Sequence, residues 1–159
     1  MDDYNKTYKE AGDIFGKFPE KMLINFVETA VKKGFSLDIG AGQGRNSFYL
    51  AEKGFSIDAA DSSEVAVEFM RKNNKFSNLN ILKSSFENFN SDKNYDLRLI
   101  FGLIQILSYN QSLILAEKVS SLSKKGTTVL ITSFSEKDDT FNFDKNNFQE
   151  YRTNYFVNN

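Results

Sequence analysis

The sequence predicts an α/β fold, in which helices cover both faces of an open parallel sheet. Short apolar runs that suit buried parallel strands alternate with segments whose apolar residues have helical spacing. The first of these runs, FSLDI at 35–39, leads into three glycines at alternate positions and then into a helical pattern. This order is typical of a site that binds a nucleotide-like group at the carboxyl ends of parallel strands. With 159 residues and 40% hydrophobic content, the chain is expected to form a single domain.

The boundaries of each element follow from its pattern and from the residues at its ends. Pro19 precedes the first clear amphipathic helix and Gly34 ends it, while Gly54 takes the C-terminal position of the helix after the glycines. Ser62 or Ser63 is expected to cap the next helix. We expect strands at 35–39, 55–60, 78–85, 96–101 and 127–134, joined by right-handed crossovers. We expect helices at 20–33, 44–53, from 64 onwards, at 110–123 and at 144–152.

Two segments and one residue fit this alternation of strands and helices less well. Residues 1–18 are polar and aromatic without a clean period, and together with the first helix they are expected to form an N-terminal cap over 1–33. The charged, amide-rich stretch 135–147 is predicted to be a loop that could border a substrate site. Arg98 interrupts an apolar strand, so its side chain is expected to extend to a sheet edge or to an acid.

The composition excludes several kinds of chemistry. Cysteine and histidine are both absent, so disulfides, thiolate or histidine catalysis and metal sites built from these residues are impossible. A net charge of −1 disfavours nucleic acid as a partner. No apolar stretch approaches the roughly 20 residues of a membrane span, and the polar N-terminus is unlike a secretory signal. We therefore expect a cytoplasmic protein that binds neither nucleic acid nor a membrane and has no metal site.

Asp38 and the glycines at 40, 42 and 44 form the pattern D-x-G-x-G-x-G. Glycine permits positive φ and a close approach of the backbone to a ligand, and the following helix points free N–H groups toward it. A dinucleotide site has the spacing G-x-G-x-x-G, whereas here the third glycine comes one residue early and an acid precedes the first. Because an acid repels a pyrophosphate and suits an ammonium group, a nicotinamide-dependent oxidoreductase is the weaker interpretation.

The segment LDIGAGQGRNSFYLAEKGFSIDAADSS resembles class I S-adenosylmethionine-dependent methyltransferases of the tellurite-resistance and thiopurine methyltransferase-like group. GDIFGKFPEKML before it and YDLRLIFGLIQIL after it resemble the same group, so that the likeness extends over most of the chain. It implies a three-layer Rossmann-like sheet, S-adenosyl-L-methionine as the cofactor and a small-molecule methyl acceptor. The resemblance also implies a set of cofactor-binding residues: Phe15, Asp38, Gly40, Ala41, Gly42, Gly44, Arg45, Asn46, Asp61, Ser62, Ser85, Phe86, Phe101 and Gly102.

The resemblance gives these residues different parts of the cofactor. Asp38 and the glycine turn would hold the methionine part, and Asp61 would accept both ribose hydroxyls. Ser85 stands where the group has an acid for the adenine, so adenine binding would depend on backbone groups and on stacking against Phe86. Phe101 and the glycine after it would contribute backbone contacts under the methyl-donor end.

Each of these residues also has an ordinary structural explanation that the sequence leaves open. Asp38 could cap the glycine turn, and Asp61 could cap the helix that follows it. Phe15 could pack in the core or cover the cofactor. The pairs at 45–46 and 85–86 could be a solvated helix start and a plain loop. Gln105 stands where related enzymes carry a polar group that faces substrate, but it could also be a capping residue.

Without histidine, the chain suits an acceptor that needs no strong base, such as a thiol or a chalcogen oxyanion. The group's sheet ends with a sixth strand and an antiparallel seventh, and this chain stops at NYFVNN, where the sixth would begin. The expected alternatives are a natural truncation, a fragment, or a homodimer that pairs through the open edge of the fifth strand. A non-catalytic cofactor-binding or partner-binding module is the rival interpretation of the function.

Overall fold

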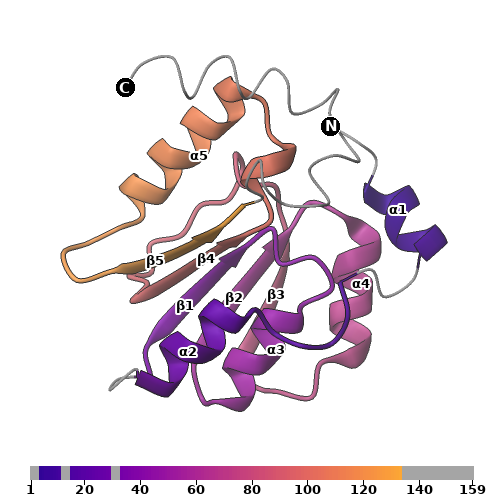
Figure 1. Cartoon of the computed structure of the whole chain (residues 1–159), viewed down its shortest axis with the longest axis horizontal. Helices are drawn as coiled ribbons and strands as arrows, with labels where there is room; N and C mark the ends of the chain where they lie inside the picture. The colour runs from indigo at the N-terminus through magenta and orange to yellow at the C-terminus, as the bar shows by residue number, and fades with distance from the viewer. Residues whose placement is uncertain (1–3, 12–14, 30–32, 134–159) are drawn as a thin grey trace.

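The computed structural model describes residues 4–11, 15–29 and 33–133, and its centre is a five-stranded sheet (Figure 1). The strand order is β3-β2-β1-β4-β5, and every neighbouring pair is parallel. The strands are β1 (Phe35–Ile39), β2 (Ser56–Asp61), β3 (Leu79–Lys83), β4 (Leu97–Phe101) and β5 (Thr128–Thr132). The order reverses between β1 and β4, so the carboxyl ends of these two strands border the crevice where open parallel sheets bind ligands.

Helices cover the two faces of the sheet unequally (Figure 1). The helical segments are α1 (Tyr4–Ala11), α2 (Lys21–Thr29), α3 (Arg45–Glu52), α4 (Glu64–Asn73), the 3-10 helix η1 (Ile104–Ile106) and α5 (Tyr109–Ser121). Leu23 of α2, Leu50 of α3 and Met70 of α4 are fully buried in one apolar cluster against Ala59 and Leu99 of the strands. The cluster on the other face is closed by α5 and by the loop between β3 and β4, which contribute residues such as Leu115 and Phe89.

The predicted alternation of strands and helices is confirmed, with ends that shift by a few residues. The predicted strand 55–60 is found at Ser56–Asp61, and Ser63 rather than Ser62 caps α4. The N-terminal helix α1 was not predicted. The loop 135–147, the helix 144–152 and the segment NYFVNN lie outside the described residues. Within the described part of the chain, no helix combines the length and the apolar character that a membrane span needs.

The expectation for Arg98 is wrong. β4 is an interior strand between β1 and β5, and Arg98 is fully buried beneath α5 rather than extended to a sheet edge or an acid. One terminal nitrogen donates to the Val119 carbonyl (2.8 Å) and to the Ser123 hydroxyl near the end of α5. Its guanidinium also lies 5.8 Å from the centre of the Tyr95 ring. The C-terminal end of a helix attracts cations, so the partner of this buried charge is α5.

Candidate functional site

The glycine turn after β1 requires glycine on steric grounds. Gly40, Gly42 and Gly44 have φ values of 73°, 56° and 87°, in the left-handed region that other residues rarely adopt. A Cβ atom on Gly42 would lie 2.9 Å from the Tyr8 hydroxyl, and one on Gly44 would lie 2.7 Å from Cγ of Met70. Gly44 is also the N-cap of α3 and provides no side-chain cap. The first N–H groups of α3 therefore lack a capping oxygen from this residue and suit an acceptor from a ligand.

Asp38 is the acid that precedes this turn on β1. It is 2% exposed, and the Ser47 hydroxyl of α3 donates to its Oδ2 (2.6 Å). Burial raises the pKa of Asp38 to about 6, the Ser47 hydrogen bond opposes the rise, and the charge of Asp61 adds to it. This carboxyl group is therefore poised to ionise fully when a positive group approaches, because a cation favours the charged form.

Asp61 ends β2 and ties it to the glycine turn. The backbone N–H of Gly42 donates to Oδ2 (2.7 Å), and the N–H of Ser63 donates to Oδ1 (2.8 Å). The residue is 8% exposed, and burial raises its pKa although both backbone hydrogen bonds lower it. A carboxylate has about four lone-pair sites, so each oxygen can still accept one more hydrogen bond. Asp61 thus joins the ends of β1 and β2 into one acidic site.

Arg45 and Asn46, the first residues of α3, hold the N-terminal segment beside the turn. Arg45 donates to the carbonyls of Phe15 (3.1 Å) and Phe18 (3.3 Å) and forms an ion pair with Glu20. The Glu20 N–H donates in turn to Oδ1 of Asn46 (2.9 Å). Phe15 is half exposed, with its ring 5.8 Å from the Arg45 guanidinium and 6.5 Å from the Tyr8 ring, so it does not pack in the core. Figure 1 shows the chain that leads into α2, residues 15–20, passing beside the start of α3.

Two residues of α1 belong to the site although the sequence did not indicate them. Oδ1 of Asn5 accepts hydrogen bonds from the Ser63 hydroxyl (2.8 Å) and the Val65 N–H (3.4 Å), which fixes α1 to the start of α4. Tyr8 is 6% exposed with its hydroxyl over Gly42, and burial together with the Asp61 charge raises its pKa. The signal that could have revealed this helix is the Tyr4–Tyr8 spacing, whose rings lie 6.0 Å apart on one face.

The structure changes the interpretation of the residues after β3. Ser85 accepts a hydrogen bond from the Asn88 N–H (3.4 Å), so its side chain supports the local loop. Phe86 is 5% exposed and packs in the apolar cluster beneath α5. Stacking of the Phe86 ring on an adenine is therefore disfavoured, because the ring is already part of the core. Ser62, which follows Asp61, is exposed.

The end of β4 completes the rim of the site. Phe101 is partly buried against the first core cluster, and Gly102 follows it with a φ of 67°. Leu103 packs against the turn, with its Cδ1 3.3 Å from the position of a Cβ on Gly40. Gln105 lies on η1, whose caps are Leu103 and Leu107, so it is not a capping residue. Its Oε1 is buried and has no hydrogen-bond partner among the described residues.

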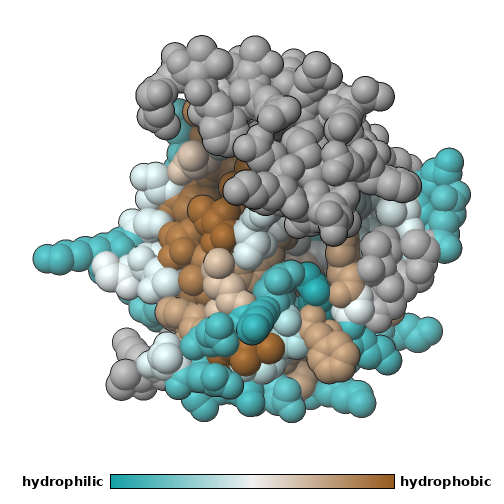
Figure 2. Space-filling model, viewed as in Figure 1, coloured by the Kyte–Doolittle hydropathy of each residue, from teal (hydrophilic) through white to brown (hydrophobic). Residues whose placement is uncertain are grey.

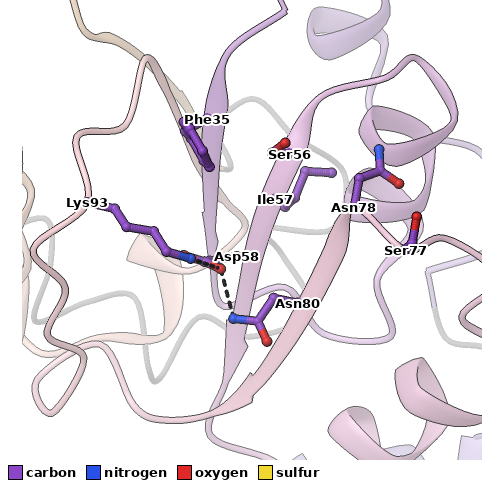
Figure 3. A pocket seen from close by; sticks show the side chains of 8 residues that line it. All are labelled: Phe35, Ser56, Ile57, Asp58, Ser77, Asn78, Asn80 and Lys93. Carbon is purple, nitrogen blue, oxygen red and sulfur yellow. Dashed lines mark hydrogen bonds and ion pairs between the residues drawn. The ribbon is translucent and has the colours of Figure 1, made fainter.

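A shallow pocket of about 190 Å³ lies elsewhere, at the amino ends of β1, β2 and β3 (Figure 3). Its lining consists of Phe35, Ser56, Ile57, Asp58, Ser77, Asn78, Asn80 and Lys93. Lys93 and Asn80 both donate to the buried Asp58, as the dashed lines in Figure 3 show. The glycine turn and Asp61 lie at the opposite ends of the same strands, so this pocket is separate from the candidate site.

A parallel sheet with this strand order, a glycine turn after β1 and an acid at the end of β2 form a Rossmann-like fold, and solved structures of methyltransferases share it. A glycopeptide N-methyltransferase, MtfA, in complex with S-adenosyl-L-methionine is similar with a TM-score of 0.66 and 21% identity, covering 77% of this chain and 57% of that one. Coclaurine N-methyltransferase is similar with a TM-score of 0.59 and 23% identity, covering 69% of this chain and 34% of that one. At these identities the likeness shows the fold.

The family follows from the sequence as a whole. The profile of the family described as tellurite resistance protein TehB matches residues 14–157, and the chain belongs to this family. The TehB proteins of two Haemophilus influenzae strains, described as probable S-adenosyl-L-methionine-dependent methyltransferases, are 27% identical over 124 residues. That match covers 72% of this chain and 43% of the relatives, so the chain spans less than half the length of these curated relatives.

Proposed function

We propose that this chain is an S-adenosyl-L-methionine-dependent methyltransferase domain that acts on a small nucleophilic acceptor. The observation that carries the proposal is the junction of two buried carboxyl groups, Asp38 and Asp61, at one glycine turn. The family match supports it, as does the description of the TehB relatives as probable S-adenosyl-L-methionine-dependent methyltransferases. The cofactor would supply an electrophilic methyl group on a sulfonium sulfur.

The residues present fit such a cofactor. Asp38 offers a buried carboxylate to an ammonium group, and the pKa near 6 means that the group ionises within the neutral range. Asp61 retains a free acceptor site on each oxygen, which matches two neighbouring hydroxyls of a ribose. Ala41 and the three glycines would let the backbone approach the methionine part closely. The backbone at Ser62, Ser85 and Gly102 would border the remaining parts of the cofactor.

The N-terminal segment would act as a cover that excludes water. Phe15 is fixed by Arg45, and Tyr8 lies over Gly42 beside Asp61, so both are placed at the edge of the proposed cofactor site. Asn46 holds the same segment through Glu20. Exclusion of water strengthens the charge interactions of Asp38 and Asp61 with a bound group, since these act in a lower dielectric.

Catalysis would depend on positioning. The chain has no histidine, and the described carboxyl groups of the site are engaged with hydroxyl and N–H donors. Holding the reacting atoms in line can contribute on the order of 7 to 11 kcal/mol to lowering a barrier. A thiol, a chalcogen oxyanion or a similar nucleophile is therefore the proposed acceptor class, because it does not require a strong general base.

Calorimetry and a product assay test this proposal together. S-adenosyl-L-methionine should bind to the purified chain with one site, and a coupled assay should detect S-adenosylhomocysteine when thiols, selenite or tellurite are added. Binding without product in any mixture would support the rival function, a non-catalytic cofactor-binding module. Failure to bind the cofactor would overturn the proposal.

We also propose that two copies of the chain associate through β5. In the described sheet β5 pairs with β4 alone, and its residue Ile131 is 46% exposed. Figure 2 shows apolar surface on the side of the molecule where β5 and α5 lie. An edge strand with such a surface favours pairing with another chain. Sedimentation velocity should then show a dimer that Ile131→Lys converts to a monomer, whereas a wild-type monomer at high concentration would contradict the proposal.

A further inference from the structure

Ser47 joins α3 to the acid that precedes the glycine turn. Its side chain is fully buried, and its hydroxyl donates to Oδ2 of Asp38 over 2.6 Å. A serine within a helix commonly bonds to a carbonyl of its own preceding turn, whereas this hydroxyl reaches across to β1. Hydroxyls that donate to a charged oxygen do so over about 2.5 to 2.7 Å, and bonds between neutral groups are longer. The distance therefore fits a hydrogen bond to the ionised form of Asp38.

The nearest neighbours of Asp38 in the sheet are apolar. Its partners on the two adjacent strands are Ala59 and Leu99, which bring neither a charge nor a side-chain donor. Above the turn lies the Tyr8 hydroxyl, which stays protonated because burial raises its pKa. Asp38 is itself 2% exposed, so water does not replace a donor that the protein fails to supply.

Charged and polar groups act on Asp38 in opposite directions. Burial is the largest influence and raises the pKa of Asp38, and the negative charge of Asp61 on β2 adds to the rise. The Ser47 hydrogen bond is the strongest influence that lowers this pKa, ahead of the charge of Arg45. Arg45 is held by Glu20 and by two backbone carbonyls, so it acts only from a distance. Ser47 is therefore the main local support for the negative charge of Asp38.

We propose that Ser47 is a positioning residue of the cofactor site, whose hydroxyl keeps the Asp38 carboxyl group in the ionised form that an ammonium group of the cofactor requires. This inference rests on the proposed methyltransferase function and adds to it a residue that acts through Asp38. None of the described hydrogen bonds engages Oδ1 of Asp38. That oxygen can therefore accept from an ammonium group while Oδ2 accepts from Ser47.

The chemistry of an ammonium group explains why the hydroxyl matters for binding. An ammonium group has N–H donors and no acceptor, so a protonated carboxyl group would present a competing hydrogen and no charge to it. Without the Ser47 donor, burial would keep Asp38 protonated to a higher pH. The cofactor would then have to displace that proton, and its affinity would fall wherever Asp38 is protonated. Above that pH range the carboxylate is ionised with or without Ser47, so the affinities should converge.

The first experiment measures the affinity for S-adenosyl-L-methionine by calorimetry at pH 5, 6, 7 and 8. Ser47→Ala should raise the pH at which the affinity increases by about one pH unit or more, the scale of a hydrogen bond to a charged group. It should therefore bind about tenfold more weakly than wild type at pH 5 and within about twofold of it at pH 8. Ser47→Cys, which keeps a weaker donor, should give an intermediate pH profile.

Two controls separate this role from a structural one. Ser36 lies two residues before Asp38 on β1, is fully buried, and its Oγ has no hydrogen-bond partner among the described residues. Ser36→Ala removes the same group from the same face of the strand and should leave the pH profile unchanged. The second control is a ligand, 5′-methylthioadenosine, which lacks the ammonium group. Its affinity for Ser47→Ala should match its affinity for wild type at every pH.

The second experiment follows Asp38 itself in the unliganded protein. Carbon-13 NMR of the aspartate carboxyl groups records its titration, and Asp38→Asn assigns its signal. Ser47→Ala should raise the pKa of Asp38 by about one pH unit or more, and Ser36→Ala should leave it unchanged.

The contrary results separate this inference from the proposed function. If Ser47→Ala leaves the Asp38 titration or the pH profile of S-adenosyl-L-methionine binding unmoved, the inference is overturned and the proposed function stands. An equal loss of affinity for 5′-methylthioadenosine would also overturn it, because the hydroxyl would then support the site as a whole. If wild type binds S-adenosyl-L-methionine at none of these pH values, the inference and the proposed function both fail.

Discussion

Asp58 and Asp61 lie three residues apart on β2, both are at least nine-tenths buried, and their surroundings are opposite. Asp58 accepts hydrogen bonds from Lys93 (2.7 Å), from the Tyr95 hydroxyl (2.6 Å) and from Asn80 (2.8 Å). Burial opposes its ionisation, but these donors outweigh burial and lower its pKa. Asp61 receives two backbone N–H groups, and burial raises its pKa.

The opposite pKa shifts of Asp58 and Asp61 distinguish an acid that stabilises the fold from one that is available to a ligand. At the amino ends of the strands, the charge of Asp58 is compensated within the protein by a cation and two neutral donors. At the carboxyl ends, Asp38 and Asp61 raise the cost of each other's ionisation, and a ligand cation would relieve it. Arg45 and Lys83 lower the pKa of Asp38 and Asp61 only from a distance, and no described ion pair joins a cation to either carboxyl group. Buried acids of this kind at one end of a sheet indicate the binding end.

The largest expected effect is on stability and comes from Asp58. Asp58→Ala leaves Tyr95 and Lys93 without their acceptor, so the free energy of unfolding at pH 7 should fall by about 3 kcal/mol, as measured by urea denaturation. Lys93 is half exposed and regains water, which keeps the loss at the lower end for a buried pair. The loss should shrink as the pH falls below the ordinary pKa of 3.8, because a depressed folded-state pKa stabilises only the ionised form. If Asp58→Ala were as stable as wild type, Asp58 would not be a structural acid, and it would no longer differ from Asp61 in this respect.

The second expected effect is a rise in the free energy of unfolding, and it comes from the substitution Asp38→Asn. Its pKa is about 6 in the folded chain and 3.8 in the ordinary state, so between these values the unfolded chain binds fewer protons and stability falls as the pH rises. Asp38→Asn should remove this decline and be about 2 to 3 kcal/mol more stable than wild type at pH 7. Denaturation of both proteins at pH 4, 5, 6 and 7 tests it. Parallel curves for wild type and variant would contradict the assignment.

The ionisation of Asp38 also predicts how the affinity for the cofactor depends on pH. Because an ammonium group prefers the carboxylate, the affinity of wild type for S-adenosyl-L-methionine should rise as the pH increases through about 6. Asp38→Asn should bind more weakly and with little pH dependence over the same range. Asp58→Asn is the matched control, since Asp58 lies in the separate pocket at the other ends of the strands.

The next expected effect is smaller than those of Asp58 and Asp38, and it is a loss of affinity for the cofactor when Asp61 is replaced. Asp61→Ala removes the proposed acceptor of two ribose hydroxyls, so the affinity for S-adenosyl-L-methionine should weaken by about 1 to 3 kcal/mol in calorimetry. Asp58→Ala, measured with the fraction of folded protein held equal, should change the affinity by much less. Equal losses in the two variants would show that both act through stability.

The sheet could be predicted from the sequence because its signals are local. Apolar runs, glycines at 40, 42 and 44, and the acids after them specify strands and a turn without knowledge of distant segments. α1 could not be predicted in the same way. Its position depends on Asn5, which contacts Ser63 58 residues further along the chain, and a short polar helix has no pattern that reveals such a partner.

The sequence indicates the acids beside the glycine turn, but it does not show which of the acids of the sheet are compensated by a cation within the protein. Asp58 and Asp61 are both acids in an apolar strand, and the sequence does not show that Lys93, 35 residues later, neutralises only the first. Arg98 looked like a misplaced charge because its partners, Val119 and Ser123, come together only when α5 packs on the sheet. The burial of Phe86 could not be predicted either, because it depends on contacts with distant residues such as Leu37 and Leu115.

The smallest effect tests how α1 is held at the binding end. Ser63 caps α4 by accepting from the Ala66 N–H (3.2 Å), and its hydroxyl donates to Asn5 of α1. Ser63→Ala should lower the free energy of unfolding by about 1 kcal/mol, the usual value of an N-cap, and should increase hydrogen exchange of the α1 amides. Ser62→Ala is the control, because Ser62 is exposed and does not cap α4. Faster exchange confined to α4 would show that Tyr8, which lies over Gly42, holds α1 in place and that the Asn5 contact does not. The Tyr8 ring alone would then cover the acidic site.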